Sequence, residues 1–200
     1  MISIIVLAAG KSTRFGANKL LSDVQGVSMI RRVVAEAVAS AADETVVVLG
    51  FEAERVKAEL LGIGCRFVLN EGFEVGQSSS VKKGVEAVSD HAEAALILPG
   101  DVAFISSGVI DKVIEGYRNS GAPIVVASHG RRSGHPILFQ RSVFPDIMDI
   151  DEKGKGLKRV TTKYPSRIKR VEVGSDAILQ DVDTEKDLLK YTSGRDRIKT

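Results

Sequence analysis

The chain has 200 residues, 44% of them hydrophobic and 27% charged, with a formal net charge of +2. This is the ordinary composition of a globular domain with a full core, and its interspersed charges argue against a basic nucleic-acid-binding face. A single cysteine, Cys65, excludes an intrachain disulfide and favours a reducing compartment, and no apolar run is long enough to span a membrane. These features predict a cytoplasmic protein with neither nucleic acid nor a membrane as partner.

Short β-branched runs alternate with amphipathic helical patterns along the chain. Strands are predicted at 2–7, 45–49, 66–69, 94–98, 123–127, 137–139 and 169–173. Helices are predicted at 29–39, 53–61, 79–88, 109–118, 143–150 and 157–162. Apolar strands connected by helices favour right-handed crossovers and a sheet covered on both faces. We therefore predict a single doubly wound α/β domain, mostly parallel, over residues 1–191, and a basic C-terminal tail at 192–200.

The first predicted strand runs directly into a glycine-bearing turn with three cations, Lys11, Arg14 and Lys19. Glycine lets the backbone approach a ligand closely, successive N–H groups can point at phosphate oxygens, and the cations neutralise charge. Two better-known phosphate motifs are excluded. Ile5 stands where a P-loop needs its first glycine, and no G-x-G-x-x-G follows the strand. The turn is interpreted as a nucleotide phosphate site of another kind.

Carboxylates occur at two places that suit a metal. Asp101 directly follows a buried strand, and a second cluster, Asp181-Val182-Asp183-Thr184-Glu185-Lys186-Asp187, precedes a short helix. Two carboxylates beside a triphosphate suit Mg²⁺, with Mn²⁺ as an alternative, because both ions take oxygen ligands. The second cluster has another interpretation, an N-terminal cap of that helix with Asp187 in its first turn.

Two further polar segments follow strands. The first runs from Asn70 to Ser80 and ends in three serines, at least one of which is expected to cap a helix. The second is Gly134-His135-Pro136, preceded by a loop at 129–133 that is expected to be mobile. Arg131 and Arg132 in that loop either meet an acceptor phosphate or are simply solvated. His91 and His129 are predicted to be surface residues.

The order L-A-A-G-x-S-x-R-x-G-x-x-K from Leu7 to Lys19 resembles the opening signature of the nucleotidyltransferases with a molybdenum cofactor acceptor. It also resembles, more broadly, the nucleoside-diphosphate-sugar pyrophosphorylases, whose fold is Rossmann-like. The resemblance implies that Asp101 and Asp183 hold the catalytic magnesium. It further implies that Arg14 stabilises the leaving phosphates and that Lys19 stabilises the α-phosphate. Together these matches give the catalytic residues Arg14, Lys19 and Asp101.

The resemblance extends to substrate contacts. The implied nucleotide-binding residues are Leu7, Ala8, Ala9, Gly10, Lys11, Ser12, Arg14, Lys19, Asn70, Ser80 and Gly100, and the implied acceptor-binding residues are Gly134, His135 and Pro136. Two departures stand out. Glu71 replaces the proline that usually follows the asparagine, and Val102-Ala103 follow Asp101 where the family has a residue and then proline.

The implied reaction transfers a nucleoside monophosphate from NTP to a phosphate-bearing acceptor and releases pyrophosphate. Ala9 occupies a position where the family's guanylyl members have glycine, and its methyl group favours a pyrimidine, hence CTP. Molybdopterin is the expected acceptor, with a molybdoenzyme or its maturation chaperone as a possible protein partner. Two alternatives stay open: a sugar phosphate or other phosphorylated alcohol as acceptor, and a non-catalytic nucleotide sensor or cofactor chaperone.

Overall fold

The computed structural model describes residues 1–13 and 15–193, which form one α/β domain around a seven-stranded sheet. The strand order is β3-β2-β1-β4-β6-β5-β7. The strands are β1 (Ile2–Ala8), β2 (Glu44–Leu49), β3 (Arg66–Leu69), β4 (Ala94–Pro99), β5 (Ile124–His129), β6 (Arg132–Gln140) and β7 (Ile168–Glu172). Strand β6 is antiparallel to its neighbours β4 and β5, and the other pairs are parallel. The predicted fold class is confirmed.

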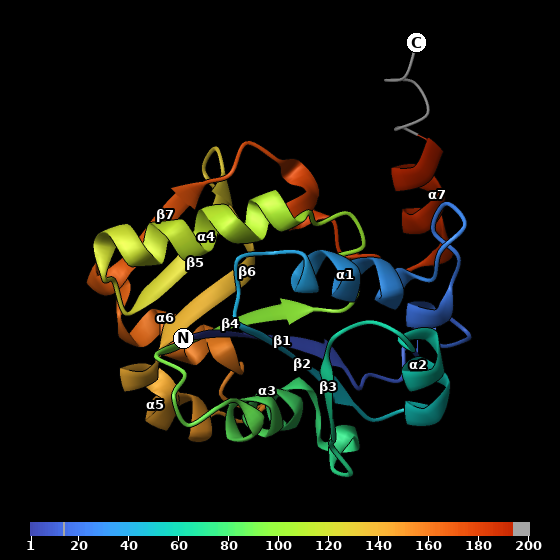
Figure 1. Cartoon of the computed structure of the whole chain (residues 1–200), viewed down its shortest axis with the longest axis horizontal. Coiled ribbons are helices and arrows are strands. Elements are labelled where there is room, and N and C mark those ends of the chain that lie inside the picture. Colours follow the sequence, from blue (N-terminus) through green and yellow to red (C-terminus); the bar gives the residue numbers. More distant parts are fainter. Residues whose placement is uncertain (14, 194–200) are drawn as a thin grey trace.

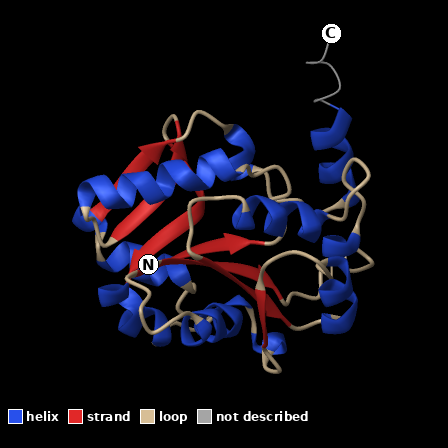
Figure 2. Cartoon of the chain, in the orientation of Figure 1, coloured by secondary structure: helices blue, strands red, loops and turns tan. Residues whose placement is uncertain are grey.

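Helices cover both faces of the sheet (Figures 1 and 2). The α-helices are α1 (Met29–Val38), α2 (Ala53–Glu59), α3 (Gln77–Ala87), α4 (Ser107–Ser120), α5 (Phe144–Met148), α6 (Leu157–Lys163) and α7 (Glu185–Ser193). The 3-10 helices are η1 (Lys19–Leu21), η2 (Phe73–Val75), η3 (Arg141–Val143), η4 (Pro165–Arg167) and η5 (Asp176–Leu179). Of the predicted basic tail at 192–200, residues 194–200 lie outside the described part of the chain.

Two apolar cores separate at the plane of the sheet because successive strand residues point to opposite faces. On β1, Ile4, Val6 and Ala8 pack with α1, α2 and α4, whereas Ile5 and Leu7 pack with α3, α5 and α6. Both faces of the strand are buried, as the continuous apolar run predicts. We call these the α1/α4 face and the α3/α6 face.

The segment around 130 differs from its prediction as a mobile loop. It is a tight hairpin in which His129 pairs with Arg132, and Gly130 takes the left-handed φ of 59° that the reversal requires. Strand β6 therefore begins earlier than the predicted 137–139, and Gly134-His135-Pro136 lies within it. The first half of β6 was not predicted as a strand because its residues are polar, and only the second half is apolar.

The antiparallel course of β6 decides where its polar half lies. The carboxyl ends of β1 and β4 lie side by side, because Leu7 pairs with Pro99. Since Ile97 pairs with Ile137, the residues that precede Ile137 on β6 lie toward this same edge. The turn that directly follows β1 (residues 9–13, which we call the signature turn), Asp101 and His135 thus lie together at one edge of the sheet. This is the usual ligand-binding edge of an open α/β fold. Within the described residues, no helix has the length and apolar character needed to cross a membrane.

Candidate active site

The signature turn forms one wall of a cavity of about 480 Å³ at the carboxyl end of β1. Ala9, Gly10, Lys11, Ser12 and Thr13 border it. Ser12 takes a left-handed φ of 53°, and its carbonyl accepts a bond of 2.8 Å from the Phe15 amide, which closes the turn. A Cβ on Gly10 would meet no atom within 4 Å, so the space beside this backbone is open to a ligand. We call this space the nucleotide cavity.

Lys19 enters the nucleotide cavity from η1, a short helix that is held by an N-terminal cap and by one side chain packed into the core. The Asn18 side chain accepts a bond of 3.2 Å from the Leu20 amide, and Leu20 is buried in the core. Lys19 Nζ then lies 2.7 Å from Asp101 Oδ2 and 3.1 Å from Asp183 Oδ1. The structure thus brings together three side chains that are 82 and 164 positions apart in the sequence.

The two acidic segments meet through the backbone. The Val182 amide donates to the carbonyl of Asp101 at 3.2 Å, and the Val182 side chain is fully buried against the α1/α4 face. On the other side, the Gly100 amide donates to the Leu7 carbonyl at 2.9 Å. Asp101 is therefore held between β1 and the segment that carries Asp183. Gly100 contributes this positioning and does not border the cavity.

The cap interpretation of the second acidic cluster is correct for part of it. Thr184, directly before α7, is the N-cap residue of that helix. Asp187 Oδ2 accepts a hydrogen bond from the Thr184 amide at 2.9 Å, and Thr184 Oγ1 accepts one from the Asp187 amide at 3.2 Å. This is a reciprocal capping arrangement. Because Thr184 and Asp187 supply the cap between them, Asp183 is left to face Lys19 and the nucleotide cavity.

The electrostatics of this cluster suit a divalent cation. Burial disfavours the charge of Lys19, but Asp101 and Asp183 outweigh it and raise its pKa above the usual value. Partial burial, together with Asp101 and Asp183, raises the pKa of Asp181 to about 6. Asp101 Oδ1 is buried with no hydrogen-bond partner among the described residues. An unpaired carboxylate oxygen beside a second carboxylate is the donor set that Mg²⁺ or Mn²⁺ takes.

Asp101 and Asp183 fit such an ion only if other oxygens complete its shell. Among the described residues, no three His, Cys, Asp or Glu side chains are grouped as a metal-holding set. Magnesium is commonly bound by one or two carboxylates together with substrate phosphates and water. The site is therefore arranged for a cation that arrives with a phosphate ligand.

Asn70 organises the adjoining loop and does not border the nucleotide cavity. Its side chain is buried, with Nδ2 donating to Ser79 Oγ at 2.9 Å and to Ser80 Oγ at 3.0 Å, while Oδ1 accepts from the Gly72 amide at 3.1 Å. Both ends of the amide are thus occupied by the loop itself. Ser80 does border the cavity.

Sequence reasoning missed four residues of this loop that border the nucleotide cavity: Phe73, Glu74, Gly76 and Gln77. Glu74 forms an ion pair with Lys11 of the signature turn, and Lys11 Nζ lies 5.7 Å from the centre of the Phe73 ring. These contacts join the two rims of the cavity. The glycines of the segment indicate a loop beside the site, but no pattern in it indicates which side chains face inward.

A second cavity, of about 590 Å³, adjoins the first on the α3/α6 face and shares Leu7, Gln77 and Pro99 with it. His135 borders this cavity. Burial lowers the pKa of His135 below its ordinary value, with Asp101 acting in the opposite direction, and its Nδ1 has no partner among the described residues. The second cavity is therefore lined by a neutral imidazole with an unused nitrogen.

The remaining predicted residues divide by strand face. Leu7 borders both cavities, but Ala8 packs on the opposite, α1/α4 face. Gly134 and Pro136 likewise alternate with His135 on β6. Pro136 is buried, and a Cβ on Gly134 would lie 2.0 Å from the Ile178 carbonyl oxygen, so that glycine permits close packing of η5. Arg14, predicted as a catalytic residue, lies outside the described residues.

The curated relatives that match much of the chain include two bifunctional proteins of the same name. The bifunctional protein GlmU of Desulfotalea psychrophila is 27% identical over 186 residues, which cover 90% of this chain and 52% of that protein. The bifunctional protein GlmU of Thermotoga maritima is 34% identical over 161 residues, covering 79% of this chain and 35% of that protein. The chain thus spans about half the length of the first relative and about a third of the second.

Solved structures match the chain over nearly its whole length. A homologue of Mycobacterium tuberculosis Rv0371c from Mycobacterium sp. strain JC1 superposes with a TM-score of 0.85 at 28% identity, covering 99% of this chain and 98% of the other. Rv0371c of M. tuberculosis itself, solved in complex with manganese, gives a TM-score of 0.77 at 23% identity, covering 96% and 98%.

At lower identity the likeness is one of fold alone. Molybdopterin-guanine dinucleotide biosynthesis protein A of Archaeoglobus fulgidus superposes with a TM-score of 0.75 at 14% identity, covering 98% of this chain and 99% of the other.

The family model described as the MobA-like NTP transferase domain matches residues 4–168. That match spans β1 through the start of β7 and includes the signature turn, Lys19 and Asp101. The chain belongs to the MobA-like NTP transferase family, a family of nucleotidyltransferases.

Proposed function

We propose that this protein transfers a nucleoside monophosphate from an NTP to a phosphate-bearing acceptor, with release of pyrophosphate. One observation carries the proposal: Lys19 Nζ contacts both Asp101 and Asp183 in the nucleotide cavity, which opens into a second cavity beside it. A cation-binding pair of acids, a lysine and two adjoining cavities are what a two-substrate phosphoryl-group reaction requires.

In this reaction an oxygen of the acceptor phosphate attacks the α-phosphorus of the NTP. A new P–O bond forms as the bond to the β-phosphate oxygen breaks, and the electron pair leaves with pyrophosphate. An acceptor phosphate is already ionised near neutral pH, so no protein base is needed. Catalysis then consists of positioning and charge neutralisation.

The residues divide the work by position. The backbone of the signature turn and Lys11 hold the triphosphate, and Lys19 neutralises charge at the α-phosphate. Asp101 and Asp183 are the residues that would hold Mg²⁺, which supplies electrophilic charge at the phosphate oxygens when bound. Arg14 is assigned to the leaving phosphates from the signature alone. Ser80, whose oxygen already accepts from Asn70, keeps a hydroxyl proton to donate to the nucleotide.

CTP is the proposed nucleotide. Ala9 is buried at the wall of the nucleotide cavity and leaves no room behind it, since a Cβ on Gly50 would lie 2.7 Å from the Ala9 methyl carbon. A methyl group that cannot retreat narrows the space for a base and disfavours a purine. A contact of this size discriminates by about 1–3 kcal/mol, roughly 10- to 200-fold in kcat/KM.

Molybdopterin is the proposed acceptor, in line with the family and with the fold shared with a molybdopterin-guanine dinucleotide biosynthesis protein. The second cavity has the size of a small-molecule site and a mixed lining. Ile97, Ile137 and Leu157 offer an apolar surface, and His135 an unused ring nitrogen. A flat heterocycle with a phosphate suits this combination.

The test is pyrophosphate release with Mg²⁺, molybdopterin with and without bound metal, and CTP, GTP, ATP or UTP in turn. We expect release with CTP, and Ala9→Gly is expected to raise relative activity with GTP. If CTP binds but no nucleotide yields pyrophosphate with molybdopterin, then molybdopterin is not the acceptor. Sugar phosphates would be tested next. Binding of CTP without turnover on any acceptor would favour a sensor.

A further inference from the structure

The second cavity continues along β6 into a smaller hollow of about 250 Å³. Both are bordered by Ser133, His135, Ile137 and Thr161. The first three alternate along one face of β6, and Thr161 lies opposite them on α6. Shared walls make the two spaces one groove, which runs from the nucleotide cavity across the α3/α6 face to the edge strand β7. We call it the acceptor groove.

The acceptor groove holds two buried polar atoms that nothing in the described residues satisfies, Ser78 Oγ and His135 Nδ1. Ser78 is only 4% exposed. It belongs to the same serine run as Ser80 but faces the other cavity, because both residues lie on α3 and residues two positions apart on a helix point to opposite sides. A buried polar atom without a partner is destabilising by about 1–3 kcal/mol and is uncommon in folded proteins. The groove is therefore arranged for a polar ligand.

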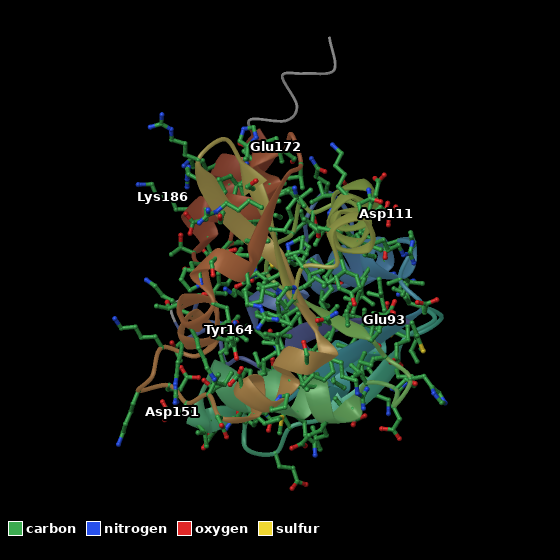
Figure 3. All side chains as sticks on the ribbon, turned by 90° about the vertical axis from the view of Figure 1, so that its left-hand side faces the viewer. Glu93, Asp111, Asp151, Tyr164, Glu172 and Lys186 are labelled. Atoms are coloured by element: carbon green, nitrogen blue, oxygen red, sulfur yellow. The ribbon has the colours of Figure 1, made fainter. Side chains whose placement is uncertain are left out.

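The chain segment that walls the acceptor groove is strongly basic. Between Lys153 and Arg170 there are eight Lys and Arg residues and no Asp or Glu. Figure 3 faces this side of the molecule, with Asp151 just before the segment, Tyr164 after α6 and Glu172 at the end of β7. Lys163 of the segment pairs with Asp146, and Arg159 donates to the Asp149 carbonyl at 3.2 Å.

The three cationic side chains that border the groove, unlike Lys163, have no carboxylate partner among the described residues. For Lys155, Lys158 and Arg170, no carboxylate of the described residues lies within 4.0 Å. Arg170 Nε donates to Ser133 Oγ at 3.3 Å, which points the guanidinium at the far end of the groove. Arg170 sits on the α3/α6 face of β7, beside Val126 of β5, which in turn pairs with Ile137.

Acidic side chains near the groove are engaged by backbone donors. Glu152 accepts from the Ser78 amide at 2.5 Å, at the start of α3. Glu172, two residues from Arg170 on the same face of β7, accepts from the Gly130 amide at 2.8 Å and the Gly174 amide at 3.0 Å. The positive charge at the far end of the groove is therefore available to a ligand.

We propose that the acceptor groove is built for an elongated acceptor with a second acidic group, a phosphate or a carboxylate, at the end away from its reacting phosphate. Molybdopterin has a single phosphate, so a preference for such a molecule would favour another phosphorylated alcohol as the acceptor. Arg170 and Ser133 bind this second group, and Lys158, which borders the second cavity, adds positive charge along the groove. The assignment of the near end rests on the proposed function. Arginine presents paired N–H donors that match the oxygens of carboxylate and phosphate, so it suits a fixed terminal anion better than lysine does.

The test compares two probes that differ only in the distal charge, hexyl phosphate and hexane-1,6-diyl bisphosphate. Each is titrated calorimetrically into protein saturated with Mg²⁺ and a non-hydrolysable CTP analogue. We expect the bisphosphate to bind at least about tenfold more tightly, which corresponds to about 1.4 kcal/mol. Arg170→Gln should reduce this preference to within about threefold, and Arg170→Lys should restore only part of it.

Lys169→Gln is the matched control. It removes the same charge one residue away, but Lys169 points to the α1/α4 face of β7. The control should keep the full preference, and thermal unfolding should verify that all variants are folded. Equal binding of the two probes to the unaltered protein, no binding of either, or an equal loss in Lys169→Gln would each overturn the proposal.

The titration together with the pyrophosphate-release assay separates this proposal from the proposed function. If an acceptor is turned over but a distal anion does not improve binding, the proposed second acidic group is refuted and the proposed nucleotidyl transfer still stands. A preference that depends on Arg170, with no pyrophosphate released from any phosphorylated acceptor, would support the anion site and refute transfer.

Discussion

Lys19 Nζ lies 2.7 Å from Oδ2 of Asp101 and 3.1 Å from Oδ1 of Asp183, so the lysine occupies the space between the two proposed metal ligands. An ammonium group repels a divalent cation, so a metal bound by Asp101 and Asp183 competes with Lys19 for the charge of these carboxylates. A metal that arrives with a triphosphate would displace the lysine toward the phosphate charge, where it is needed. Binding of the metal and release of Lys19 are thus linked.

This linkage predicts opposite effects of Lys19→Met on metal binding and on turnover. Without nucleotide, the variant should bind Mn²⁺ several-fold more tightly, because its competitor for Asp101 and Asp183 is gone. Pyrophosphate release should fall by about 10²–10³-fold, because charge at the α-phosphate is no longer neutralised. Mn²⁺ titration followed by electron paramagnetic resonance measures the first effect. The control is Lys83→Met, which removes a partly exposed lysine of α3 that pairs with Glu86. Weaker Mn²⁺ binding in Lys19→Met would contradict the linkage.

Asp101→Ala should reduce pyrophosphate release by about 10²–10³-fold or more while the fold stays intact. The Asp101 contact to the Val182 amide is made by its backbone carbonyl, which the substitution leaves in place. Circular dichroism and thermal unfolding check the fold. Asp90→Ala, which alters a fully exposed carboxylate, should keep normal turnover. Substantial activity in Asp101→Ala would refute the metal assignment.

Asn70 and Ser80 should differ in how they affect the enzyme. Asn70→Ala breaks three hydrogen bonds within a buried loop, so it should lower the free energy of unfolding by about 1–3 kcal/mol and also raise the KM for nucleotide. Ser80→Ala should raise the KM with a smaller change in stability. Denaturant unfolding and steady-state kinetics on both variants test this. A stable Asn70→Ala variant with only a KM defect would indicate a direct base contact instead.

Glu44 should make the stability of the fold depend on pH. Burial opposes ionisation of this carboxyl, but hydrogen bonds from Ser3 Oγ, the Ser89 amide and Arg66 outweigh burial and lower its pKa below the ordinary value of a glutamate. A carboxyl whose pKa is lower in the folded state stabilises the fold above its unfolded pKa, and this stabilisation is lost as the pH falls through the folded pKa.

Glu44→Gln should therefore be less stable than the unaltered protein by about 1–2 kcal/mol at pH 7. The difference should disappear as the pH falls below the native pKa of Glu44. Urea unfolding at a series of pH values measures both. Glu115→Gln, on the exposed side of α4, should give no such pH-dependent difference. A gap that persists in acid would show that packing, and not charge, is responsible.

Local patterns were sufficient for the strands near the N-terminus. Ile2–Ala8 is apolar on both faces, and only a sheet covered on both sides buries such a run. Patterns failed at β6, where the polar half from Arg132 to Pro136 has no strand signal of its own. That half is extended because it pairs with β5 across the hairpin at Gly130, a contact between chain segments that no local pattern contains.

The sequence by itself determined the type of fold and the identity of the chemical groups. A β-branched strand followed by a cation-bearing turn, with acids after later strands, predicts phosphate chemistry at one edge of a sheet because parallel strands share their carboxyl ends. Only the tertiary structure decided which groups face one another. It set Lys19 between Asp101 and Asp183, and it pointed Ser80 and Ser78 into different cavities. Alternation along β6 pointed His135 into the acceptor groove and kept Pro136 out of it. The physical reason is that the direction of each side chain depends on strand register and on backbone contacts between residues far apart in the chain. The hydrogen bond from the Val182 amide to the Asp101 carbonyl is one such contact.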